Sequence, residues 1–110
     1  MDDNLQKLHP PIDNRIVQQL LAVIPEGWWS IVLDVTRDAE AAEGSELSLS
    51  ISSDEGYRDI VMPPREMYET VIQHADLFAS HRQPWSTLRY RVFFDETIDN
   101  WRFTIDYDYA

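Results

Sequence analysis

The clearest pattern in the chain is a strict alternation of apolar and polar residues near its C-terminal end. From Trp101 to Tyr109, large apolar or aromatic residues occupy the odd positions, and polar residues occupy the even ones. This period of two predicts a half-buried β-strand. Another β-run precedes it at residues 84–94, and the polar residues at 95–100 predict a turn between the two. We therefore expect an antiparallel hairpin in this part of the chain.

Two segments show the apolar spacing of amphipathic helices. In residues 12–24 the apolar positions recur in steps of four, one and three, and a proline and a glycine follow. Residues 1–11, which end in two prolines, are expected to form a short leader before this helix. The second helix is predicted to begin after Pro63-Pro64, because proline is tolerated in the first turn of a helix, and to end within residues 81–84.

Three further segments are predicted as strands. Residues 28–37 and 46–52 alternate between apolar and polar positions, and residues 57–62 are expected to add a short third strand. The order of elements is then α-β-β-(β)-α-β-β. Most connections between strands have hairpin length, so the sheet is expected to be antiparallel. The sequence predicts a single α+β domain over residues 1–110, with four to five strands and both helices packed on one face of the sheet.

Length and composition fit one domain with an apolar core. The 110 residues are 44% hydrophobic and contain no cysteine, which excludes disulfide bonds and thiolate metal sites. The first residues are acidic and are not followed by the apolar segment of a signal peptide, and no apolar stretch is long enough to span a membrane. We therefore expect a cytoplasmic protein without membrane contact.

The charge of the chain restricts its partners. Twenty acidic residues against nine basic ones give a net charge of −11. A surface this negative repels a phosphate backbone, so direct binding of nucleic acid is not expected. It attracts a basic protein instead and raises the rate of encounter at low salt, although plain solubility is an equally simple reason for the charge.

The sequence shows no arrangement that is typical of catalysis or of metal binding. No serine stands in a Gly-x-Ser-x-Gly turn, and the three glycines are too far apart to form a phosphate-binding loop. His74 and His81 are seven residues apart and lack the spacing of a zinc-protease pair, so we interpret them as histidines on a helix surface. Asp106 and Asp108 share one face of the last strand, where contacts to a basic partner are favoured over catalysis. We expect no catalytic residues, no metal and no cofactor.

The polar positions of the predicted strands should form one uncovered face of the sheet. Its mixture of charges and small side chains is more typical of a protein-binding surface than of an active site. Trp28 and Trp29 are adjacent and point to opposite sides, so one of them is expected to be exposed, as a binding anchor or as packing at the rim. Because every second residue of a strand points to the same side, this uncovered face is expected to carry Asp34, Thr36, Glu46, Ser48, Ser50, Ser52, Arg89, Arg91, Phe93, Arg102, Thr104, Asp106 and Asp108.

Three short motifs occur in a recognisable succession. The first helix ends in Ile-Pro-Glu-Gly-Trp-Trp (residues 24–29), Gln-Pro-Trp-Ser-Thr (residues 83–87) precedes the hairpin, and Phe-Thr-Ile-Asp-Tyr-Asp-Tyr (residues 103–109) closes it. Over roughly residues 12–109 the chain resembles the YezG-like antitoxin family, the immunity proteins of bacterial polymorphic toxin systems. The chain departs from the family pattern in its acidic loop at 38–46 and in its turn at 95–100.

The resemblance implies a non-enzymatic inhibitor that binds a secreted toxin of contact-dependent growth inhibition. Many toxins of this kind are nucleases with basic clefts, so the implied partner is the C-terminal domain of a cognate toxin, a basic nuclease whose functional surface is occluded. The residues predicted to contact it are Asp34, Asp54, Glu55, Asp59, Asp106 and Asp108, with Trp28 or Trp29 as the aromatic anchor.

Two other interpretations belong to different classes of protein. In the first, a small-ligand-binding or enzymatic domain has a cleft between the second helix and the sheet, where His74 and a carboxylate act as acid and base. In the second, the chain is an adaptor that joins a larger complex through an edge of its sheet.

Overall fold

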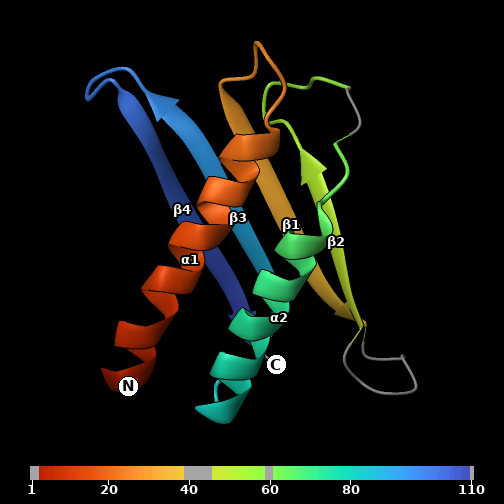
Figure 1. Ribbon diagram of the computed structural model, residues 1–110, viewed down its shortest axis with the longest axis vertical. Helices are drawn as coiled ribbons and strands as arrows, with labels where there is room; N and C mark the ends of the chain where they lie inside the picture. The colour runs from red at the N-terminus through yellow and green to blue at the C-terminus, as the bar shows by residue number, and fades with distance from the viewer. Residues whose placement is uncertain (1–2, 39–45, 59–60, 110) are drawn as a thin grey trace.

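The computed structural model describes residues 3–38, 46–58 and 61–109, which are arranged in two layers. The elements are α1 (Asp3–Val23), β1 (Ser30–Asp38), β2 (Glu46–Ser52), α2 (Arg65–Ser80), β3 (Trp85–Asp95) and β4 (Asn100–Tyr109). The strands form one antiparallel sheet in the order β2-β1-β3-β4, and both helices lie over the same face of it (Figure 1). The predicted α+β class and its antiparallel sheet are confirmed.

The sheet consists of two hairpins that meet in its centre. The β1–β2 hairpin and the β3–β4 hairpin are separated in sequence by α2, and β1 pairs with β3 from Ser30↔Phe93 to Thr36↔Thr87. The two central strands carry most of the buried strand residues, and the two edge strands carry half-buried ones. The helices therefore cover the middle of the sheet more completely than its edges.

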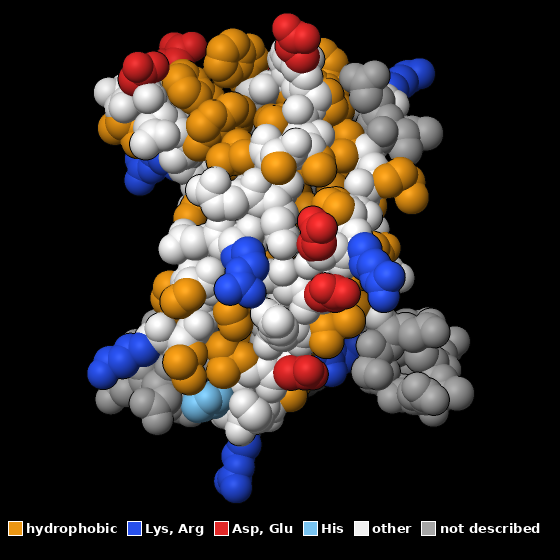
Figure 2. Space-filling view, viewed as in Figure 1, with side chains coloured by type: hydrophobic (Ala, Val, Ile, Leu, Met, Phe, Trp, Pro, Cys, Tyr) orange, Lys and Arg blue, Asp and Glu red, His pale blue; other side chains and the backbone are white. Residues whose placement is uncertain are grey.

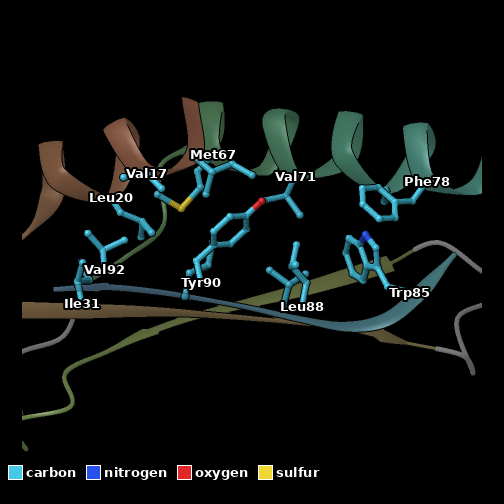
Figure 3. Packing of buried hydrophobic residues seen from close by; sticks show 14 of the residues in the cluster. Val17, Leu20, Ile31, Met67, Val71, Phe78, Trp85, Leu88, Tyr90 and Val92 are labelled. Carbon is cyan, nitrogen blue, oxygen red and sulfur yellow. The ribbon is translucent and has the colours of Figure 1, made fainter. Parts of the chain in front are cut away.

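The apolar core fills the space between the helix layer and the sheet. Figure 3 shows side chains of α1 and α2 pointing toward side chains of β1 and β3, with Trp85 and Phe78 closing one end. Burial of one large apolar side chain contributes about 1.5–3 kcal/mol, so this layer provides most of the stabilisation. The fully buried residues of the core include Ile16, Leu20, Ile31, Leu33, Met67, Val71, Trp85, Leu88, Tyr90 and Val92.

The first helix is longer than predicted. It begins at Asp3, and Pro10 and Pro11 lie inside it, so residues 3–11 belong to the helix and the expected leader is wrong for this part of the chain. A proline inside a helix removes a backbone hydrogen bond and costs about 3 kcal/mol. Two contacts of His9 oppose this cost: its ring lies 5.6 Å from that of Phe78 in α2, and its Nδ1 is 2.6 Å from Asp13 Oδ2, one turn further along α1.

The predicted third strand at residues 57–62 is not formed by its described residues, Tyr57, Arg58, Val61 and Met62. This segment instead connects β2 to α2, and the ring of Tyr57 stacks on Trp28 at 5.8 Å. Among the described residues, no helix is long and apolar enough to cross a membrane.

Candidate functional site

The side of the sheet that faces away from the helices is the only large face without a covering layer among the described elements. We call it the open face. The strand registers arrange its side chains in rows that cross β1, β3 and β4. The four rows are Thr36, Thr87 and Asp108; Asp34, Arg89 and Asp106; Val32, Arg91 and Thr104; and Ser30, Phe93 and Arg102.

Arg89 lies in the centre of the open face between two aspartates. Its Nε donates to Asp34 Oδ1 at 2.6 Å, and its terminal nitrogen donates to Asp34 Oδ2 at 3.4 Å. Asp106 is in register with Arg89 on the other side. The hydrogen bond and charge of Asp34, with a smaller effect of Asp106, raise the pKa of the Arg89 guanidinium above its ordinary value. These side chains line a shallow hollow of about 410 Å³.

A second arginine links the open face to the turn after β2. Arg91 Nε donates to Asp54 at 2.5 Å. Because Val32 is in register with Arg91 on one side and with Ser52 on the other, the Arg91 side chain passes over Val32 to reach Asp54. Val32 is accordingly buried although no helix covers it. The guanidinium of Arg91 is therefore paired with Asp54 at the surface.

Glu55 fastens the same turn to the beginning of β1. Its Oε1 accepts hydrogen bonds from the Trp29 backbone N–H at 2.9 Å and from the Ser30 hydroxyl at 3.0 Å. With Asp54, Arg91 and Phe93 these residues line a second hollow of about 450 Å³ at this end of the open face. Glu55 thus has a structural role that uses one of its two carboxylate oxygens.

The two adjacent tryptophans have different environments. Trp28 is 4% exposed and packs in the core, whereas Trp29 is 60% exposed. The Trp29 ring lies 5.3 Å from that of Phe94, which lies 5.5 Å from Trp101. Figure 2, seen from the helix side, shows hydrophobic side chains gathered at the end of the molecule that holds the β3–β4 turn. Of the two residues predicted as alternatives for the anchor, Trp29 is therefore the exposed one and Trp28 is buried.

The structure brings most of the predicted contact residues onto one surface. Asp34, Asp106 and Asp108 line the first hollow, and Trp29, Asp54 and Glu55 line the second. Asp59 lies outside the described residues. The sequence did not predict the pairing of Arg89 and Arg91 with the aspartates. The alternation of side chains along each strand indicated that these residues share one face, but not which of them are partners.

A buried polar network lies inside the core, on the other side of the sheet. Asp13 Oδ1 accepts hydrogen bonds from His74 Nε2 at 2.9 Å and from the Tyr90 hydroxyl at 2.5 Å. His74 is fully buried, so its interpretation as a helix-surface histidine is wrong. The spacing contained a signal for this: His74 is three residues after Val71 and four before Phe78, on the apolar stripe of α2.

The ionisation of Asp13 follows from this environment. Burial alone would raise the pKa of its carboxyl group, but hydrogen bonds from His74, Tyr90 and His9 outweigh burial and hold the pKa below the usual value of 3.8. The same burial, together with the charge of Asp13, raises the pKa of the Tyr90 hydroxyl far above its usual value. The network therefore contains a carboxylate that is ionised at neutral pH and is surrounded by three donors.

This network is not arranged for acid–base catalysis. His74 Nδ1 accepts a hydrogen bond from Trp85 Nε1 at 3.1 Å, so both ring nitrogens are occupied within the core. The alternative function that used His74 as an acid or base in a cleft lacks an accessible imidazole. Within the described residues, no three His, Asp or Glu side chains are grouped as metal ligands.

No protein-family model matches this chain, and no curated protein matches it. The resemblance to the YezG-like antitoxins therefore rests on the sequence motifs and stays a prediction.

Proposed function

We propose that this protein is an immunity protein that binds a cognate toxin domain and neutralises it through the open face. The observation that carries this proposal is the row Asp34–Arg89–Asp106, in which a bidentate ion pair and a further carboxylate are exposed in the centre of an uncovered sheet. The Asp34–Arg89 pair of this row is formed before binding, which lowers the entropic cost of association.

Binding would use the carboxylates of the open face that are least engaged within the chain. The carboxylates of Asp34 and Asp54 already pair with Arg89 and Arg91, whereas the Asp108 carboxylate accepts from the neutral Thr87 hydroxyl, at 2.9 Å. Asp106 contributes a charge beside Arg89. Basic side chains of the toxin would thus meet Asp106 and Asp108 first, while the exposed Trp29 would fill an apolar pocket at the end of the interface.

The partner that fits this surface is a basic protein domain. The net charge of −11 would attract a basic domain to the protein and make the association faster at low salt. A nuclease has the basic cleft that this mechanism needs, and covering the cleft would exclude its substrate. We place the encounter in the cytoplasm, where such a nuclease would find its nucleic-acid substrate.

The test is capture of partners from the native host by the immobilised chain, at low and at high salt, with identification by mass spectrometry. We expect one basic toxin fragment that is lost at high salt. Recovery of a stable complex of metabolic proteins, or of nothing by a folded bait, would contradict the proposal.

Charge reversal then locates the contact surface. The double variant Asp106→Lys/Asp108→Lys should bind the captured toxin more weakly and with a flatter dependence on salt. The control is Glu69→Lys/Asp76→Lys, which makes the same change of charge on exposed residues of α2, on the opposite side of the molecule. If the two variants lose affinity equally, only the net charge matters and the open face is not the interface.

A further inference from the structure

The outer edge of β4 has the features of a strand that pairs with another strand. Among the described residues β4 pairs with β3 alone, and every second residue of an edge strand directs its N–H and C=O away from its neighbour. Exposed edges are usually protected by charged side chains, above all lysine, by proline or by a bulge. The ten residues Asn100–Tyr109 contain neither lysine nor proline, and the one irregularity of the β3–β4 pairing is at Trp85/Thr87, near its end. The charged residues of β4 are Arg102, Asp106 and Asp108, which carry both signs.

The helix-side residues of β4 are not fully covered by their own chain. Trp101, Phe103, Ile105, Tyr107 and Tyr109 alternate along the strand, and Phe103 is 37% and Tyr109 56% exposed. Figure 1 shows the first half of β4 outside the two helices. Cross-strand pairs of aromatic or branched side chains stabilise a sheet. A second strand with a similar row of side chains would therefore stabilise this edge most.

β4 is complementary in charge to a second, antiparallel copy of itself. If Thr104 of one strand lies opposite Thr104 of the other, Arg102 lies opposite Asp106, and two-fold symmetry makes this pair occur twice. Both side chains are exposed on the open side of the strand. On the helix side the same register places Phe103 opposite Ile105 and Trp101 opposite Tyr107. Opposite charges and aromatic or branched pairs in direct cross-strand positions stabilise a sheet.

We propose that two copies of this chain pair through the outer edges of β4, antiparallel and with Thr104 on the two-fold axis. An axis perpendicular to the sheet gives a continuous sheet with both helix layers on the same side. In Figure 1 the N-terminal turns of α1 extend beyond β4, and Leu8 in these turns is 50% exposed. Such turns are positioned to cover apolar side chains of the second copy.

The first experiment is sedimentation of the full chain without any partner, over the micromolar to millimolar range. The expected result is an average mass that rises with concentration toward that of a dimer, with no larger species, because each chain offers one edge of this kind. A monomer at every concentration overturns the proposal. Since no toxin is involved, this result is independent of the proposed immunity function.

Charge variants test the register. Arg102→Asp leaves an aspartate opposite each Asp106, and Asp106→Arg leaves an arginine opposite each Arg102, so each variant alone should raise the dimer dissociation constant on the order of tenfold or more. Mixed in equal amounts, the two variants restore both opposite-charge pairs. We therefore expect a heterodimer at concentrations where each variant alone is a monomer.

Two controls separate pairing from other effects. Glu69→Arg changes the charge on α2, away from the edge, and should leave dimerisation unchanged. Circular dichroism of each variant should match that of the unmodified chain, which excludes loss of fold. A mixture that stays monomeric, although the unmodified chain dimerises, overturns this register and the β4 edge as the interface.

Discussion

The indole N–H of Trp85 donates a 3.1 Å hydrogen bond to Nδ1 of the buried His74. Indole nitrogen is only a donor, so Nδ1 of the imidazole carries no proton and Nε2 carries it. The Nε2–H group then donates to Asp13 Oδ1 at 2.9 Å. One contact at the start of β3 therefore fixes the neutral tautomer of a histidine in α2 and its orientation toward an aspartate in α1.

Trp85→Phe should destabilise the fold, because it leaves the buried Nδ1 of His74 without a donor and removes apolar volume. We expect a loss of about 2–4 kcal/mol in the free energy of unfolding, measured by chemical denaturation. Trp101→Phe is the matched control, because Trp101 is only half-buried in an edge strand. Equal losses for the two variants would show that the indole–imidazole bond contributes nothing.

Asp13→Asn should lower stability in a way that depends on pH. The pKa of Asp13 is lowered in the folded protein, so its contribution is fully present above the unfolded value of 3.8 and is lost as pH falls through the folded pKa. We expect a deficit of about 3 kcal/mol near neutral pH, because an amide cannot accept from all three donors. Urea denaturation at several pH values should show this deficit shrinking below pH 3.8; a constant deficit would contradict the assignment.

Tyr90→Phe should raise the pKa of Asp13, because the carboxylate loses one of its three hydrogen-bond donors. Carbon NMR of the Asp13 carboxyl group measures this pKa directly. The free energy of unfolding near neutral pH should fall by about 2 kcal/mol, the contribution of a hydrogen bond to a charged group. Tyr109→Phe, on an exposed side chain, should change neither quantity.

The two adjacent tryptophans should respond differently to truncation. Trp28→Ala empties part of the core and should cost about 3–5 kcal/mol of stability. Trp29→Ala should leave the denaturation midpoint nearly unchanged and weaken toxin binding instead, as expected for an exposed anchor. Calorimetric measurement of stability and of binding for both variants tests this difference. Normal toxin binding by Trp29→Ala would remove this residue from the interface.

The choice between the two tryptophans shows what a sequence pattern leaves open. Adjacent residues in extended backbone point to opposite sides, so the sequence required that Trp28 and Trp29 differ in environment. It could not tell which one is buried, because Trp28 packs in the core and stacks on Tyr57, a residue of another segment. Likewise, parity placed Arg89 and Asp34 on one face, and only the pairing of β1 with β3 made them direct neighbours.

The sequence by itself determined the four strands of the sheet, the apolar stripes of both helices and the antiparallel pairing, because these depend on residue spacing along the backbone. The tertiary structure alone decided the start of α1 at Asp3 and the burial of Asp13 with His74 and Tyr90. These partners are 61 and 77 residues away in sequence. A buried polar residue on an apolar stripe is stable only where it forms hydrogen bonds. The donors to Asp13 are brought close to it by the packing of α1, α2 and β3 against one another.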